Sequence, residues 1–104
     1  MSFDDMGRFA DPALLILTSL ADKPRHGYAM MEDIAEFAGV KLGPGTLYGA
    51  LARLEKAGWI EPLPMDDRKR PYQLTPAGKE ALQQRLTSLQ SVAAFGQTRL
   101  RGVA

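Results

Sequence analysis

Residues 43–61 read GPGTLYGALARLEKAGWIE and predict the helix around which the rest of the chain is organised. Pro44 suits the first turn of a helix, because its missing N–H would have no partner there. Gly58 suits a left-handed C-terminal cap. Between them, apolar residues recur at helical spacing and predict one narrow buried stripe, formed by Leu47, Ala50, Leu51 and Leu54.

The opposite face of this helix carries little side-chain bulk. It consists of small residues followed by two long cations: Gly45, Gly49, Ala52, Arg53 and Lys56. A helix with a thin outer face can come close to a wide polar surface such as the major groove of DNA. The hydroxyl groups of Thr46 and Tyr48 flank this face, where they could reach phosphates. An ordinary amphipathic helix with a small outer face is the alternative, and the neighbouring segments decide between the two.

Two further helices are expected before this one. Asp11 suits the N-cap of a buried helix over 11–21, and a second helix is expected over 27–38, joined to Pro44 by the short linker 39–43. Two helices, a tight turn that contains glycine and a helix with a thin face form the helix-turn-helix pattern. His26 is the single histidine, and the chain has no cysteine, so a capping or packing role is favoured over a metal site.

The helix within residues 43–61 takes the place of the recognition helix in this pattern. Two short strands are expected after it, over 59–63 and 70–74, with a turn cluster between them. Arg68, Lys69 and Arg70 lie at or just past the tip of this hairpin. A basic hairpin directly after a recognition helix predicts a wing that covers phosphates or reaches a minor groove. A solvated hairpin without a binding role is the alternative. The predicted fold is mainly α with a small β-hairpin, a winged helix-turn-helix.

The last segment predicts one long helix from Thr75 to about residue 101. Its apolar residues are spaced 4, 3, 4, 3 and 4 apart and form a heptad seam, which Val92 and Phe95 widen: Leu82, Leu86, Leu89, Ala93, Gly96 and Leu100. A domain of this size cannot cover such a stripe along its whole length, so a second copy of the chain is the expected partner. The alternative is a helix packed wholly on its own domain. The predicted organisation is an N-terminal arm over 1–10, a DNA-binding domain over 11–74 and a dimerisation helix over 75–104.

The composition excludes several classes of protein. With 104 residues the chain forms one domain, and its hydrophobic content of 45% and charged content of 24% are typical of a soluble globular protein. The sequence contains neither a membrane-spanning run nor a signal peptide, so a cytoplasmic location is expected. The chain has a single histidine, no cysteine, no glycine-rich phosphate loop and no convergent carboxylates, so we expect no enzyme, no cofactor and no metal.

The net charge is only +1, but its distribution is uneven. Residues 1–40 carry a net charge of −4, residues 41–72 carry +2 and residues 73–104 carry +3. Positive charge in the middle and at the end of the chain is expected if one face meets an anionic polymer.

Three motifs together resemble the PadR family of winged-helix transcriptional regulators, specifically its short members. They are HGY at 26–28, GTLY at 45–48 with the following RLE and GWI segments, and the basic run 68–70 followed by Tyr72 and LTPAG at 74–78. The resemblance covers about residues 12–90. It implies a homodimer joined by the last helix, which binds an inverted-repeat operator in double-stranded DNA, usually as a repressor that a small effector or stress signal releases.

The sequence departs from the family pattern at two places. The residue after Tyr48 is often proline in the family and is Gly49 here. Some relatives bind flat aromatic drugs through a tryptophan on the dimer helix, whereas Trp59 is the only tryptophan here, so the resemblance carries over no drug site. An effector pocket, if one exists, is expected near Val92, Phe95 and the first helix. The alternative function is a winged-helix module that binds proteins without DNA.

Overall fold

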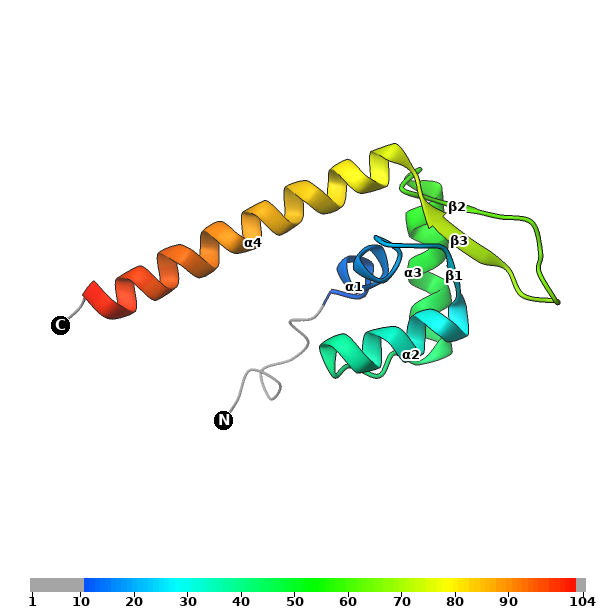
Figure 1. The fold of residues 1–104 in the computed structure, drawn as a ribbon, viewed down its shortest axis with the longest axis horizontal. Coiled ribbons are helices and arrows are strands. Elements are labelled where there is room, and N and C mark those ends of the chain that lie inside the picture. Colours follow the sequence, from blue (N-terminus) through cyan, green and yellow to red (C-terminus); the bar gives the residue numbers. More distant parts are fainter. Residues whose placement is uncertain (1–10, 103–104) are drawn as a thin grey trace.

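The computed structural model describes residues 11–102. In this part of the chain four helices and three strands follow in the order α1 (Pro12–Ser19), β1 (Arg25–His26), α2 (Gly27–Ala38), α3 (Pro44–Lys56), β2 (Ile60–Pro62), β3 (Pro71–Leu74) and α4 (Pro76–Gly102). α1 to β3 form a compact head, and α4 leaves it as a rod (Figure 1). The expected arm over 1–10 and the last two residues of the 75–104 segment lie outside the described residues.

The first helix starts as expected and ends earlier. The Asp11 carboxylate accepts the N–H of Ala13 at 2.9 Å and so caps α1. The helix ends at Ser19, two residues before the expected end, because Arg25 donates to the Ser19 carbonyl and forms an ion pair with Asp22 at 2.7 Å. Hydrogen bonding to Arg25 holds the pKa of the Asp22 carboxyl below its usual value. The turn between α1 and β1 is therefore closed by side-chain charge as well as by backbone.

The sheet has one strand more than the hairpin predicted from the sequence. Its order is β1-β3-β2, with both pairs antiparallel. β2 and β3 form the predicted wing strands, and β1 adds Arg25 opposite Tyr72 and His26 opposite Pro71. A strand of two residues is too short to produce a detectable alternation, so the sequence pattern could not indicate it. His26 also confirms the capping prediction, since its Nδ1 accepts the N–H of Ala29 at 3.3 Å at the start of α2.

One apolar core joins the three helices of the head to the sheet and to the first turns of α4. The predicted stripe of α3 is buried in it, together with apolar residues of the other elements and of the turns between them: Leu15, Ile16, Leu17, Leu20, Met30, Ile34, Leu42, Leu47, Ala50, Leu51, Leu54, Ile60, Leu74 and Leu82. Leu82 is only 5% exposed, so its partner is the core of its own head. This residue was predicted to lie in a dimer interface, and the core already covers it.

A hydrogen-bonded junction fixes the start of α4 against the end of α3. The Thr75 hydroxyl accepts the N–H of Gly78 at 3.0 Å, as expected of an N-cap, and donates to the Gly58 carbonyl at 2.6 Å. Gly58 has a φ of +80°, the left-handed conformation predicted for it. The N–H of Thr75 donates to the Trp59 carbonyl at 3.1 Å. The direction of the rod is thus set relative to the recognition helix.

Beyond its first turns, α4 extends away from the head, and no other described element lies beside this part of the helix (Figure 1). Its large apolar side chains beyond the core are exposed: Leu86, Leu89, Val92, Phe95 and Leu100. The two small residues of the predicted seam, Ala93 and Gly96, are exposed as well. These seven residues therefore form an uncovered stripe, and their role as a dimer interface stays a prediction.

Candidate nucleic-acid interface

The face of α3 turned away from the core has the thin surface that its sequence predicted. Gly45, Gly49, Arg53 and Lys56 are exposed, and Thr46 is half-buried. A Cβ atom at Gly49 would lie 3.8 Å from Nη1 of Arg53, so the guanidinium folds back along the helix over this glycine. The small residues therefore leave room on the outer surface of α3, and a planar group with several donors lies across it.

The wing ends in a tight turn with an unusual backbone. Asp66 and Lys69 exchange two backbone hydrogen bonds of 2.8 and 2.9 Å, which makes Asp67 and Arg68 the two central residues of the turn. Both have positive φ, 50° and 65°, as a type I′ turn requires. Such positions usually hold glycine or asparagine, and a bulky residue there carries some strain. The turn therefore holds Arg68 at the very tip, with Lys69 beside it.

Arg70 has a different environment from the other two wing cations. Its Nη1 donates to the Leu63 carbonyl at 2.7 Å, across the base of the wing. Arg70 therefore fastens the two arms of the loop, and at least one of its donors is used within the protein.

A hollow of about 280 Å³ connects the wing, α3 and the start of α2. It is lined by His26, Gly27, Tyr28, Tyr48, Met65, Arg68, Lys69 and Arg70. The structure thus brings Tyr48 together with the three predicted wing cations. The other predicted contacts, Gly45, Thr46, Gly49, Arg53 and Lys56, are not part of its lining and belong to the outer side of α3.

A binding role for Tyr28 or Met65 was not expected from the sequence. Tyr28 is 62% exposed on the first turn of α2 and lines the hollow beside Tyr48. The only sign of such a role in the sequence is that Tyr28 is an aromatic residue in the first turn of a helix whose outer side is acidic. Helical periodicity records only which side of a helix is buried and not which neighbour covers it, so it could not indicate this role.

Gly27 explains how Tyr48 reaches this hollow. A Cβ at Gly27 would lie 2.5 Å from Oη of Tyr48 and 3.1 Å from Cδ2 of Leu47. The 2.5 Å contact is shorter than real Cβ contacts, so any larger residue at position 27 would displace the end of the Tyr48 side chain or α3 itself. The absence of a side chain at position 27 therefore sets the place of the Tyr48 hydroxyl above the start of α2.

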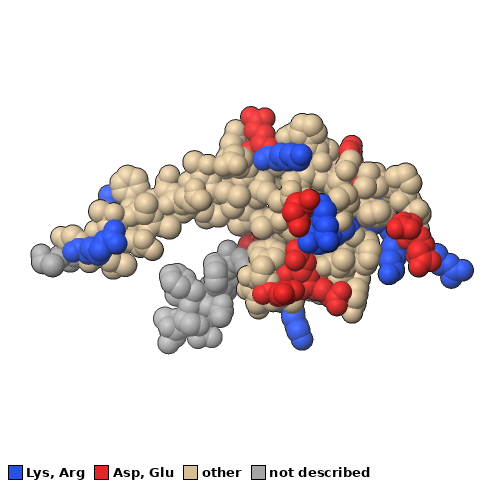
Figure 2. Space-filling model, in the orientation of Figure 1, with Lys and Arg blue, Asp and Glu red and all other residues tan. Residues whose placement is uncertain are grey.

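The cations of α3 and the wing have no carboxylate partner within the described residues. The ion pairs among the described residues lie elsewhere and join Arg25 to Asp22 and Asp33, and Arg85 to Asp11. In the view of Figure 2, lysine and arginine side chains project at the wing and at the far end of α4, with acidic groups next to the wing. The positive charge of the interface is thus available to an external anion, although the molecule as a whole is nearly neutral.

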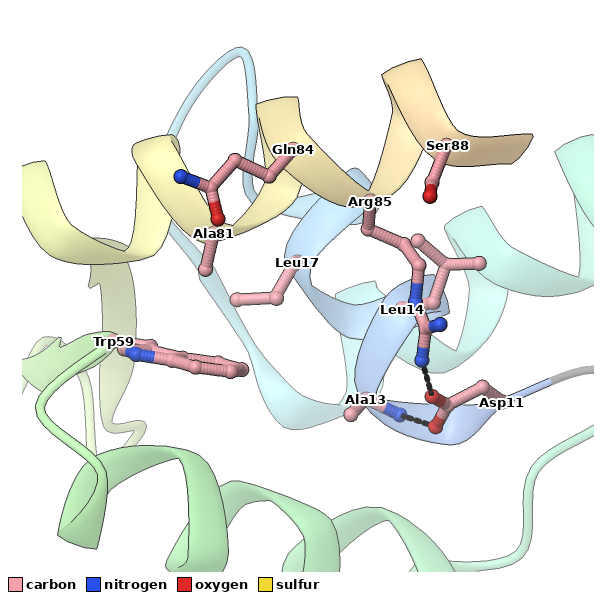
Figure 3. A pocket seen from close by; sticks show the side chains of 9 residues that line it. All are labelled: Asp11, Ala13, Leu14, Leu17, Trp59, Ala81, Gln84, Arg85 and Ser88. Carbon is pink, nitrogen blue, oxygen red and sulfur yellow. Dashed lines mark hydrogen bonds and ion pairs between the residues drawn. The ribbon is translucent and has the colours of Figure 1, made fainter. Parts of the chain in front are cut away.

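A second pocket, of about 340 Å³, lies between α1 and the near half of α4. Its walls are formed by residues of α1 and α4 and by the ring of Trp59 (Figure 3). The complete lining is Asp11, Ala13, Leu14, Leu17, Trp59, Ala81, Gln84, Arg85 and Ser88, and it includes the ion pair between Arg85 and Asp11. From the sequence, a pocket was expected near Val92 and Phe95, and these two residues do not line this one. The reason is that α1 has only eight residues and contacts the beginning of α4.

The described part of the chain offers no group of three or more metal-ligating side chains of the His, Cys, Asp or Glu type. Between residues 11 and 102, no helix has the length and apolarity needed to cross a membrane.

Comparisons with known proteins agree with this architecture. The model of the transcriptional regulator PadR-like family matches residues 16–84. The chain is 37% identical over 83 residues to the transcriptional regulator Rv3488 of Mycobacterium tuberculosis, a match that covers 77% of each protein. It is 49% identical over 82 residues to an uncharacterized 37.1 kDa protein of transposon TN4556 from Streptomyces fradiae, a match over 79% of this chain that spans only 24% of the longer protein.

Among solved structures, a PadR family transcription regulator from Clostridium difficile superimposes with a TM-score of 0.78. The match covers 86% of this chain and 97% of that one at 24% sequence identity, so it shows a shared fold. The family model covers more than half of this chain, including the helix-turn-helix, the wing and the first turns of α4. The chain therefore belongs to the PadR-like family of transcriptional regulators.

Proposed function

We propose that this protein is a homodimeric repressor that binds an inverted-repeat operator in double-stranded DNA. The observation that carries the proposal is the hollow in which Tyr28, Tyr48 and the cationic wing tip meet beside the thin face of α3. Cations and hydroxyls suit the phosphate backbone, and a helix without bulk suits the major groove. The protein would act in the cytoplasm, bind DNA without catalysing a reaction, and need no cofactor or metal.

Each predicted contact has a separate role in this proposal. Arg53 reads a base edge from the groove, while Thr46, Tyr48 and Lys56 hold phosphates. Arg68 and Lys69 hold the flanking backbone or minor groove, and Arg70 contributes mainly by keeping the wing closed through its bond to Leu63. Gly45 and Gly49 allow the close approach. Two recognition helices in a dimer would face half-sites about 34–36 Å apart, one turn of B-DNA.

Regulation would act through the geometry of the dimer. A small effector or stress signal that favours one arrangement of the two heads would change their separation and release the operator, because a ligand shifts an equilibrium only through its differential affinity for the two states. The far half of α4 is the element on which that separation depends.

The test is binding of the purified protein to fragments of the DNA upstream of its own gene, measured across a salt series. Tight binding to one fragment with an inverted repeat, and weaker binding with a steep salt dependence elsewhere, is the expected result. Arg53→Ala should lose about 1–3 kcal/mol on that fragment and relax one base position. If the loss on random DNA is equal, Arg53 contacts a phosphate instead.

The wing is tested by Lys69→Ala, with Lys79→Ala as a matched control at the exposed start of α4, away from the hollow. Loss of one phosphate contact should lower the slope of log K against log salt concentration by about one unit for Lys69→Ala only. Equal slopes for both variants would remove the wing from the interface.

The alternative function is a winged-helix module that binds proteins without DNA. The cations on α3 and the wing argue against it, since a protein-binding module would need no row of unpaired cations on its recognition helix. Absence of binding to every fragment at low salt would favour this alternative.

A further inference from the structure

His26 lies where α2, the sheet and the wing meet. In β1 it is paired with Pro71, the residue that follows Arg70 in the chain. It is also the N-cap of α2, and its Nδ1 accepts the backbone N–H of Ala29 at 3.3 Å. The strand pairing and the cap together fix the imidazole ring beside the base of the cationic wing.

The cap determines which nitrogen of the ring carries the proton. A nitrogen that accepts an N–H must itself be unprotonated, so Nδ1 of His26 offers its lone pair to Ala29. In a neutral imidazole the proton then lies on Nε2, which becomes a hydrogen-bond donor. The two nitrogens point outward from different sides of the ring, so this donor is directed away from the N–H that Nδ1 accepts.

The Nε2 donor is open to an external acceptor. Within residues 11–102, the hydrogen bond of the His26 ring is the cap itself. In the same part of the chain, no buried side-chain nitrogen or oxygen lacks a partner. Because Nε2 has no partner there, it is not buried and lies at the surface of the head.

The His26 ring lines two hollows whose charges differ. The hollow beside α3, of about 280 Å³, is lined by three cations and two tyrosines and by no described carboxylate. The second hollow, of about 550 Å³, includes Asp66 and Asp67 in its lining. An anion is attracted to the first and repelled by the carboxylates of the second. The Tyr48 hydroxyl lies against Gly27, the next residue after His26, so two neutral donors adjoin the wing cations.

We propose that Nε2 of His26 donates a hydrogen bond to a backbone phosphate of the bound DNA, held in the hollow between the wing and α3. The proposal rests on the proposed DNA-binding function and adds a contact to it. The cap sets the tautomer, so one side chain both starts α2 and holds the DNA backbone. A contact of this kind fixes the position of the head on the duplex and reads no base.

Asparagine and glutamine separate the two roles of the ring, because their amide groups replace different nitrogens. The short side chain of His26→Asn keeps a capping oxygen near the position of Nδ1 and does not reach that of Nε2. The longer side chain of His26→Gln carries its amide to the position of Nε2 and is a poor N-cap. Each variant therefore removes one role and keeps the other.

The two variants should have opposite effects on stability and on binding. His26→Asn should unfold at the urea concentration of the wild type and bind the tightest upstream DNA fragment about tenfold more weakly, or worse. His26→Gln should unfold at a lower urea concentration and bind that fragment nearly as well as the wild type. Equal affinities of His26→Asn and wild type would overturn the contact. The reverse order, with His26→Gln the weaker binder, would show that His26 acts only through the cap and would also overturn it.

The salt dependence shows whether the ring acts as a neutral donor. A neutral group releases no counterion from DNA, so the slope of log K against log salt concentration should be the same for wild type and His26→Asn. Lys69→Ala, which removes a charge, should lower the slope by about one unit in the same assay. A fall of about one unit for His26→Asn would mean that a doubly protonated ring holds the phosphate, and would overturn the tautomer set by the cap.

Nitrogen NMR observes the ring directly, because His26 is the only histidine of the chain. Isotopically labelled histidine, in protein purified without a histidine tag, gives the signals of this one ring. The expected spectrum has a protonated Nε2 and an unprotonated Nδ1, and the upstream DNA fragment should shift the Nε2 signal without changing the tautomer. The opposite tautomer, or an unchanged ring in a complex that does form, would overturn the contact alone. If the wild type binds none of the fragments, the proposed function is overturned and the contact with it.

Discussion

Replacing Gly78 by alanine should destabilise the protein although alanine is the better helix former. The added Cβ would lie 1.9 Å from the carbonyl oxygen of Trp59, where ordinary contact is 3.4–4 Å. This oxygen belongs to the backbone of the residue before β2 and cannot rotate away. The start of α4 must therefore move away from it by roughly the difference between 1.9 Å and an ordinary contact, on the order of 1–2 Å. Overpacking of this kind costs about 1–3 kcal/mol.

Two other terms nearly cancel. The movement would weaken the bond from the Thr75 N–H to the same Trp59 carbonyl, which contributes about 1 kcal/mol net. The gain in helix propensity from glycine to alanine is also about 1 kcal/mol. The net expectation is therefore a loss of about 1–3 kcal/mol in the free energy of unfolding.

Urea unfolding followed by circular dichroism measures this loss, at one fixed protein concentration because dimer formation would add a concentration-dependent term. Gly49→Ala is the matched control, since it lies in the interior of α3 and its nearest atom is the end of the Arg53 side chain at 3.8 Å. That variant should gain about 0.5–1 kcal/mol. If Gly78→Ala proves as stable as Gly49→Ala, Gly78 of α4 does not lie against the Trp59 backbone as described.

Three further predictions concern the head. Gly27→Ala should displace the Tyr48 ring, whose Oη would lie 2.5 Å from the new Cβ, and weaken DNA binding by about 1 kcal/mol or more with little change in helix content; equal affinities for wild type and variant would contradict the role given to this glycine. Asp11→Ala should lower the free energy of unfolding by about 1 kcal/mol through loss of the α1 cap, and Asp11→Asn, which keeps a capping oxygen, should recover most of it in the same urea assay. Burial, followed by the nearby charge of Glu55, raises the pKa of the Tyr72 hydroxyl, so its contribution to stability is complete below the unfolded pKa near 10 and is lost as the pH rises through the higher folded value. Tyr72→Phe should therefore remove part of the alkaline loss of stability, and identical pH profiles would show that this hydroxyl does not contribute.

The recognition helix was predictable because its signals are local. Pro44 and Gly58 set its ends through backbone geometry, and the apolar stripe sets its buried side through a period of 3.6 residues. The wing followed from the same kind of signal, since turn residues separate two short extended runs. The family resemblance then added what no local signal contains, namely that these elements occur in this order in one family of transcriptional regulators, and the family match confirmed that family.

The features missed from sequence all depend on contacts between distant segments. β1 exists because Arg25 and His26 meet the far strand of the wing, about 45 residues later in the chain. Gly27 looked like part of a helix start, and only the position of Tyr48 shows why no side chain fits there. Periodicity reports which side of an element is buried, but the partner on that side comes from the tertiary structure.

Leu82 shows the same limit on a single helix. The heptad spacing from 82 to 100 is regular, so nothing in the pattern separates its first member from the others. In the fold, the seam changes partner along its length: Leu82 is buried in its own head, while Leu89 is 44% exposed two turns later. A stripe that is continuous in sequence but only partly covered in one chain is expected where a second chain completes the same layer. The boundary between the two parts lies just beyond Leu82, since Leu86 is already 36% exposed, and a second copy along the exposed part stays a prediction.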